Sequence, residues 1–461
     1  KKIIWGITKA LLNTITEFFQ NAQHLCSLIR CAFMFVKYQN LGRVNLKKII
    51  SIIFLLQLCS SQKILIPMDE SQKDHLKAYG AAFWIIGEQI NVEWVLNYKG
   101  GSFITDYYQK IEKECRLRGV SYEIIDPETM LSIYNDVATN NMDIVLLEKT
   151  PKIAIYSPPN KQPWDDAVTL ALTYAEVPYE TLWDEEVFNG ELSKYDWLHL
   201  HHEDFTGQYG KFYKNYHTAS WYIDQKRQFE SLALKLGFNS VPEQKKALAQ
   251  IIKDFVSNGG FLFAMCSATD SYDIALSTLG IDAAHPVYDG TPIDNNLKNK
   301  INYDNSLAFE NFDIITDPMI YEYANIDFPP SNNVVVRGAE ADYFSLFEFS
   351  AKYDPVPTML TQNHVGVIKG FMGQTTGFNR EKIKKHILIM GEDETTPQVK
   401  YLHGNLGQGT FTFLGGHDPE DYQHFVGDPQ TDLSLHRNSP GYRLILNNIL
   451  FPAARKKERK T

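Results

Sequence analysis

Cys266 is the residue of this sequence whose type and position best suit a nucleophile. It ends a continuous apolar run that begins at Phe261, and such a run is typical of a strand buried on both faces of a parallel sheet. The polar residues 267–271 predict a turn, and residues 272–279 predict a helix. A thiol that ends a buried strand and faces a helix N-terminus is placed where a thiolate is stabilised. Two interpretations remain: a reactive thiol, or a small apolar residue that only fills the core.

A second group of polar side chains lies where another apolar run ends. In an extended strand, His199, His201 and Glu203 alternate onto one face, whereas His202 and Asp204 lie on the other. Three such ligands on one face could hold a zinc ion. Histidines at strand ends more commonly form only local hydrogen bonds, so we expect no metal here. We assign His199, His201, His202 and Glu203 to substrate binding.

A third group follows the pair Gly415-Gly416 and consists of His417, Asp418 and Glu420. A histidine oriented by a carboxylate can serve as the base for a cysteine nucleophile, and such sets are recognised by geometry rather than by chain order. We therefore predict a catalytic pair of Cys266 and His417, with Asp418 or Glu420 as the acidic partner. The pair requires sulfur and imidazole nitrogen to approach to about 2.6–3.2 Å, often more loosely without substrate.

Gly100 and Gly101 follow a strand expected at 92–98. Their backbone N–H groups could hold an anion, and on this interpretation they are candidate substrate-binding residues. The alternative is a tight turn that simply requires glycine.

These groups need a framework that gathers strand ends. Apolar runs predict neighbouring strands at 153–156, 195–201, 261–266 and 411–415, and helical periodicity, as in 248–256, predicts helices on both faces. The predicted fold is therefore α/β, a three-layer parallel sheet of the flavodoxin-like type. Open sheets of this kind bind ligands at the carboxyl ends of their strands, so the candidate residues should converge there.

The chain divides into two predicted domains. Residues 62–150 alternate strand and helix patterns, with a helix at 106–118 directly after the glycines, which predicts an N-terminal α/β unit with a parallel sheet. Residues 151–461 then form the main domain. Within it, 282–408 is weakly periodic and rich in aromatic runs, and a connection of that length is expected to be a lid over the ligand-binding edge.

Composition excludes one class of partner. The 461 residues carry a net charge of -10, and the sequence lacks the basic footprint of a nucleic-acid-binding protein. With 44% hydrophobic and 22% charged residues, it has the composition of an ordinary globular protein with a large core. The basic run 455–460 is expected to be a solvated tail.

Residues 45–61 have the pattern of a secretory signal peptide. Lys47 and Lys48 precede an apolar stretch of about ten residues and then small residues, too short a stretch to span a bilayer. We expect cleavage after Ser61, with residues 1–44 an upstream extension and the mature chain exported to the periplasm or cell envelope.

Cysteine usage agrees with a protein held together by its core. Cys26, Cys31 and Cys59 lie upstream of the expected cleavage site, which leaves Cys115 and Cys266. Two cysteines cannot form a disulfide framework. A thiol kept in an exported protein is unusual, which again directs attention to Cys266.

The order of these parts resembles the class I glutamine amidotransferase-like fold. The helix-Gly-Gly-strand-Cys266 unit and the Gly-His-Asp-Pro run of 416–419 before a final helix are most similar to its trehalose-utilisation (ThuA-like) branch. The stretches 63–69 and 97–103 also resemble an exported bacterial family often labelled asparagine synthetase B. Active amidotransferases flank the cysteine with glycines, whereas Ala264 and Ala268 stand here and are expected to crowd the turn.

Two functions follow as hypotheses. The first is a non-catalytic binding or assembly module of the cell envelope that keeps this fold. The second is a hydrolase or transferase, dependent on Cys266 and His417 or on a metal at His199 and His201, acting on a sugar- or envelope-derived substrate. A small-molecule or glycan ligand and an envelope protein are the expected partners, with no cofactor, no nucleic acid and no transmembrane span.

The signal-peptide hypothesis predicts the N-terminus of the exported protein. Material recovered from outside the cytoplasm should begin near Gln62, because the signal peptidase would cut after the small residues 60–61. N-terminal sequencing of that material checks this, and retention of residues 1–44 would contradict it.

Overall fold

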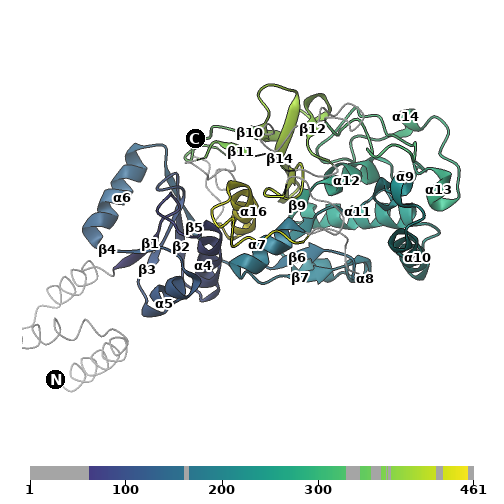
Figure 1. Ribbon diagram of the computed structural model, residues 1–461. Coiled ribbons are helices and arrows are strands. Elements are labelled where there is room, and N and C mark those ends of the chain that lie inside the picture. Colours follow the sequence, from purple (N-terminus) through teal and green to yellow (C-terminus); the bar gives the residue numbers. More distant parts are fainter. Residues whose placement is uncertain are drawn as a thin grey trace, which may run out of the picture. The chain divides into compact units, whose positions relative to one another are not determined.

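The computed structural model describes residues 62–159, 166–328, 343–354, 365–369, 371, 375–421 and 429–454. The expectations for the signal peptide, its cleavage after Ser61 and the basic tail lie outside this part of the chain. Ser61–Thr461 forms one compact unit, which contains a five-stranded and a ten-stranded sheet (Figure 1). Among the described residues, none of the helices combines the length and apolar character required to cross a bilayer.

The smaller sheet is built by residues 62–147 and has the strand order β4-β1-β3-β2-β5. Its strands are β1 (Lys63–Ile66), β2 (Val92–Leu96), β3 (Ser102–Asp106), β4 (Glu123–Ile125) and β5 (Asp143–Leu147). Its helices are α4 (His75–Gly87), α5 (Gln109–Arg118) and α6 (Pro127–Thr139). Every strand pair is antiparallel, so the expected parallel sheet is wrong for this part of the chain.

The physical reason is a hairpin that the sequence pattern concealed. Residues 102–106 pair with β2 as strand β3, and α5 begins only at Gln109 instead of 106. Two strands joined by a five-residue connection cannot lie parallel, since a parallel pair needs a crossover of a dozen or more residues. The short apolar stretch between the glycines and the helix was too brief to show a strand period of its own.

The larger sheet has the order β11-β10-β13-β14-β15-β9-β8-β6-β7, with β12 paired to β14. The strands are β6 (Ile153–Tyr156), β7 (Glu180–Leu182), β8 (Trp197–Leu200), β9 (Phe261–Met265), β10 (Tyr343–Leu346), β11 (Val367–Lys369), β12 (Phe378–Asn379), β13 (Leu388–Glu392), β14 (Gln398–Leu406) and β15 (Gly409–Leu414). The strands β7, β6, β8, β9 and β15 are mutually parallel, and the rest of the sheet continues antiparallel from β15.

The prediction that the four strands β6, β8, β9 and β15 lie side by side is confirmed, as is the three-layer α/β class. The longer helices are α7 (Ala167–Ala175), α10 (Ser220–Lys235), α11 (Val241–Ser257), α12 (Ser267–Ser277) and α16 (Pro440–Leu450). The shorter helices are α8 (Asp184–Phe188), α9 (Tyr213–Tyr216), α13 (Pro286–Asp289) and α14 (Leu297–Lys300).

Two apolar cores, one on each face, hold these layers together. On β9, Phe261, Phe263 and Met265 pack toward α7 and α16, whereas Leu262 and Ala264 pack toward α11 and α12. This alternation follows from the two-residue period of a strand. A strand with apolar residues on both faces must be covered on both, which is why helices lie on each side of it.

The two sheets are joined through α16, which contacts both α4 and α7 (Figure 1). The Arg443 side chain, fully buried on α16, donates to Met68 O at 3.2 Å and to Gly100 O at 2.8 Å. Tyr79 Oη donates to Asn447 Oδ1 at 2.5 Å. Residues 62–147 and the final helix therefore share one core.

The 282–408 insertion forms part of the main sheet. Its strands β10, β11, β13 and β14 widen the main sheet beyond β15. Its earlier part is fixed to α12 by Asp273, whose carboxylate accepts the backbone N–H groups of Leu307, Ala308 and Phe309 at 2.7–2.9 Å. Such a charge-assisted set of bonds to one buried carboxylate sets the position of this segment on α12.

A buried ion pair lies at the other edge of the main sheet, next to β6 and β7. Lys245 Nζ on α11 lies 2.8 and 3.0 Å from the two carboxylate oxygens of Asp184 and 2.6 Å from Tyr156 Oη. The ammonium also lies 4.1 Å from the ring centre of Trp183, a cation–π distance. Both charged side chains are 2% exposed, so removing one leaves the other charge buried without its partner.

Lys245→Met should therefore destabilise the protein by about 3–5 kcal/mol, because Asp184 loses its counter-charge inside the fold. Urea unfolding followed by circular dichroism measures this loss. The control is Lys235→Met, which breaks the exposed pair of Lys235 with Glu185 and should change the unfolding free energy little. Equal effects of the two variants would contradict the importance assigned to burial.

Candidate functional site

Cys266 occupies a strained turn between β9 and α12. Its backbone angles are φ 50° and ψ −137°, in the region that side-chain-bearing residues rarely adopt, and α12 begins at the next residue. The expected turn over 267–271 is therefore wrong: these residues form the first part of the helix. A single residue at positive φ between a strand and a helix is the geometry of a nucleophile elbow.

Hydrogen bonds to β15 hold this conformation. The Cys266 N–H donates to Leu414 O at 3.2 Å and to Gly416 O at 3.1 Å. Strain of this kind costs on the order of 1–3 kcal/mol and persists only where the surroundings enforce it. Ala264 and Ala268 are fully buried beside the turn and do not prevent it. The expected crowding by their methyl groups is therefore accommodated.

The histidines gather at the same edge, next to Cys266. His199 is the third residue of β8, and His201 follows the end of that strand. The ring centres of His201 and His202 are 4.6 Å apart, and those of His201 and His417 are 5.6 Å apart. The structure thus brings together the ends of β8, β9 and β15, as the parallel pairing of these strands requires.

Asp166 joins this cluster although the sequence analysis did not select it. It caps α7, with Oδ1 accepting the N–H groups of Val168 and Thr169 at 2.8 and 3.1 Å. The same oxygen lies 3.4 Å from His199 Nε2 and 3.7 Å from His201 Nδ1. A usable signal existed: a helix that follows a parallel strand starts at the carboxyl edge, so its capping residue lies there as well.

Burial and neighbouring charges shift the pKa values of the residues in this cluster. Burial opposes ionisation of Asp166, yet His199 and His201 hold the pKa of its carboxyl well below the usual range. Burial, reinforced by the charge of His201, lowers the pKa of His202 well below that of a free imidazole. His202 is therefore neutral at physiological pH.

Glu203 does not join His199 and His201 on their face, contrary to the expected alternation. β8 ends at Leu200, so the strand period no longer applies three residues later. Glu203 Oε2 accepts the N–H of His201 at 2.8 Å, and burial raises the pKa of its carboxyl to about 8. It lines a cavity of about 30 Å³ together with His202, Asp204 and Lys245. A space of that size holds about one water molecule.

Asp418 and Glu420 interact with groups other than a catalytic base. Asp418 Oδ1 accepts the N–H of Glu420 at 2.8 Å and the hydroxyl of Tyr442 at 3.0 Å, and Oδ2 accepts the hydroxyl of Thr431 at 2.8 Å. Glu420 lies 3.2 Å from His436 Nδ1. Asp418 therefore stabilises the turn before α16, and the acidic residue nearest the histidines is Asp166.

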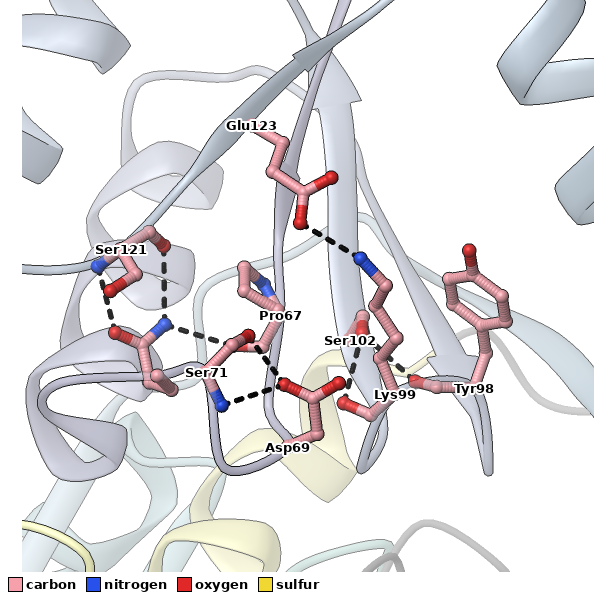
Figure 2. Close-up of polar contacts among 9 residues, drawn as sticks. Pro67, Asp69, Ser71, Tyr98, Lys99, Ser102, Ser121 and Glu123 are labelled. Carbon is pink, nitrogen blue, oxygen red and sulfur yellow. Dashed lines mark hydrogen bonds and ion pairs between the residues drawn. The ribbon is translucent and has the colours of Figure 1, made fainter.

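Gly100 and Gly101 lie in the β2–β3 hairpin of the smaller sheet, away from the histidine cluster. The Gly101 N–H donates to Tyr98 O at 3.0 Å. Ser102 Oγ donates to the same oxygen at 2.8 Å (Figure 2). Gly100 has φ 77°, and a Cβ there would meet Met68 O at 2.0 Å. Both observations describe a tight turn that requires glycine.

The insertion supplies groups close to the thiol. Burial and the proximity of Cys266 raise the pKa of Tyr321, whose ring packs against Phe212 at 5.8 Å between centres. Asp270, in the first turn of α12, is fully buried and accepts a hydrogen bond from Thr375 Oγ1 at 3.1 Å. Burial raises the pKa of this carboxyl to about 7.

Comparison with known proteins does not identify a family. No family model matches the chain, and no curated protein matches it. Among solved structures, the chain is similar to the cytoplasmic protein STM3548 from Salmonella typhimurium, with 11% identity and a TM-score of 0.32 over 66% of this chain and 100% of that one. Another match is a beta-galactosidase from Bacillus circulans sp. alkalophilus, with 12% identity and a TM-score of 0.23. It covers 59% of this chain and 29% of the enzyme.

Asp270 generates a pH-dependent prediction. Because its folded pKa is raised, the folded state holds a proton that the unfolded chain releases, so stability from this group falls as pH rises from about 4 to about 7. Asp270→Asn removes the titration. The stability of this variant relative to the unmodified protein should rise by on the order of 2 kcal/mol between pH 5 and pH 8 in urea unfolding.

Asp273→Asn is the matched comparison on the same helix. Asp273 accepts backbone N–H groups on both carboxylate oxygens, which one amide cannot do, so this variant should lose stability at pH 8. If Asp270→Asn instead lost the same unfolding free energy at every pH, burial would not be what holds Asp270 protonated.

Proposed function

We propose that this protein is a thiol-dependent hydrolase or acyl transferase whose nucleophile is Cys266. The single observation that carries the proposal is the positive φ of Cys266 in the strand-to-helix turn, at the edge where the histidines gather. A residue other than glycine is held in such a conformation at a cost in stability, and sites of this kind cluster at functional centres. This conformation supports the role of Cys266 as a nucleophile more than the role of a thiol that only fills the core.

The position of Cys266 also suits its chemistry. It directly precedes α12, an eleven-residue helix, so the partial positive charge of the helix N-terminus lies beside the sulfur. That charge stabilises the thiolate and, later in the reaction, the oxyanion of a tetrahedral intermediate. A strand end alone would provide neither effect.

His417 is the proposed base. It follows β15, the strand to whose end the Cys266 N–H is bonded, and its ring lies beside that of His201. Burial lowers the pKa of the neighbouring His202 and disfavours its protonation, so His202 is the poorer base. In this scheme His417 removes the thiol proton, and the resulting imidazolium returns it to the leaving group.

The reaction proceeds in two steps. The Cys266 thiolate attacks the carbonyl carbon of an ester or amide, and the bond to the alcohol or amine breaks after His417 protonates that group. The thioester formed on Cys266 is then attacked by water, or by another nucleophile in a transferase, which releases the acid or new acyl product and restores the thiol.

The substrate and setting follow from the resemblance to the ThuA-like branch of the amidotransferase-like fold. It supports a sugar- or envelope-derived acyl substrate, and the leader pattern supports action in the periplasm or cell envelope. The aromatic pair Phe212–Tyr321, with ring centres 5.8 Å apart, suits a ligand with an apolar face.

A second candidate is the binding or assembly module, and one observation favours it. Cys266 is only 1% exposed, so a substrate reaches it only if neighbouring groups move. A binding module would keep its ligand or partner when the thiol is replaced, whereas an enzyme would lose turnover.

Alkylation should distinguish Cys266 from the other buried thiol. Burial raises the pKa of Cys115 to about 12, so that thiol stays protonated and unreactive at pH 8. Iodoacetamide treatment of the native protein, followed by peptide mapping, should label Cys266 faster than Cys115. Equal or slower labelling of Cys266 would contradict an activated thiol.

Loss of turnover tests the nucleophile. Cys266→Ser and His417→Ala should each lower kcat/KM toward an activated ester, such as a p-nitrophenyl ester, by at least about 100-fold, while Cys115→Ser should leave it unchanged. Unfolding curves of all three variants establish that each is folded. Full activity of folded Cys266→Ser would overturn the thiol mechanism.

A further inference from the structure

Asp166, His199 and His201 present one ligand atom each, and these atoms all lie within 4.8 Å of one another. Asp166 Oδ1 is 3.4 Å from His199 Nε2 and 3.7 Å from His201 Nδ1. A tetrahedral ion with ligands at 2.0–2.1 Å separates neighbouring ligand atoms by about 3.4 Å. The two spacings from Asp166 are therefore close to those of a metal's coordination sphere.

The tautomer of His199 directs a lone pair into this space. His199 Nδ1 lies 3.0 Å from Phe263 O, and a carbonyl oxygen can only accept, so Nδ1 carries the proton. In the neutral ring, Nε2 then has its lone pair exposed toward Asp166. Ligating histidines are typically held in this way, with one nitrogen donating to a backbone carbonyl and the other bound to the metal.

Asp166 is oriented by backbone contacts to Oδ1, the same oxygen that faces the histidines. The N–H groups of Val168 and Thr169 hold Oδ1 in place at the start of α7. His199 and His201 are 0% and 1% exposed, whereas the Asp166 side chain is 17% exposed. The two histidines are thus shielded from solvent, whereas the Asp166 side chain is partly exposed.

The contact between Asp166 Oδ1 and His199 Nε2 at 3.4 Å is favourable only when positive charge lies there, either as a proton on Nε2 or as a bound cation. One proton on His199 would satisfy that contact alone. A single divalent ion would contact one ligand atom of each of the three residues at once.

We propose that Asp166, His199 and His201 bind a divalent transition-metal ion of the zinc class. Two imidazoles and one carboxylate select zinc, iron, nickel or copper over calcium or magnesium, which prefer all-oxygen sites. Three protein ligands leave a position for water or a substrate oxygen, as in catalytic rather than structural zinc sites. This set replaces Glu203 of the sequence hypothesis with Asp166, and it does not depend on Cys266 being a nucleophile.

The test uses the full chain, freed of metal with a chelator and titrated with Zn²⁺ in a calorimeter. The unmodified protein should bind one equivalent. His199→Ala and Asp166→Asn should each weaken the binding at least about 100-fold. Asp166→Asn is the variant that keeps folding intact, because asparagine caps a helix as well as aspartate does. With Co²⁺, the unmodified protein should show the visible absorption of a tetrahedral site.

Two controls separate this site from other effects. His386→Ala removes an exposed histidine outside the cluster and should leave Zn²⁺ binding unchanged. Cys266→Ala should also bind one equivalent, so failure of the thiol mechanism and failure of the metal site give different results. No binding by the unmodified protein, or binding unaffected in both His199→Ala and Asp166→Asn, would overturn the proposal.

Discussion

The parallel register of β8, β9 and β15 is the constraint on which the candidate site depends. His199 is level with Phe263, and Phe263 is level with Thr412, so the three strands end together. Parallel strands in register place whatever follows them at one edge, and here Cys266 and His417 are among the residues that follow. A shift of one residue in either pairing would turn the alternating side chains of β9 toward the opposite core.

The strained turn at Cys266 is stable because its surroundings are independently fixed. The apolar cores on both faces of β9 hold the strand, and the N–H of Cys266 is bonded to the end of β15. The buried Asp273, through its bonds to residues 307–309, holds the insertion against α12 next to the elbow. The free-energy cost of this strain is therefore small compared with the stabilisation from the packing that enforces it.

The sequence predicted the main sheet well because its strands are buried on both faces and read as continuous apolar runs. It failed for the smaller sheet, where β3 is a five-residue strand between a glycine turn and a helix. It failed at 267–271 because polar residues in the first turn of a buried helix resemble a loop. Asp166 was missed because its only signal is its place as the cap of a helix that follows a parallel strand, and spacing within the sequence does not show which histidines it meets. Glu203 was misplaced because strand alternation was extended past the end of β8.

The central claim is that Cys266 reacts covalently at the edge formed by these strands. Intact-mass spectrometry after mixing the protein with an activated ester tests it most directly. The account predicts an acyl adduct that maps to the peptide containing Cys266 and that decays as hydrolysis proceeds. Turnover with no adduct on Cys266, or an adduct only on other residues, would contradict it.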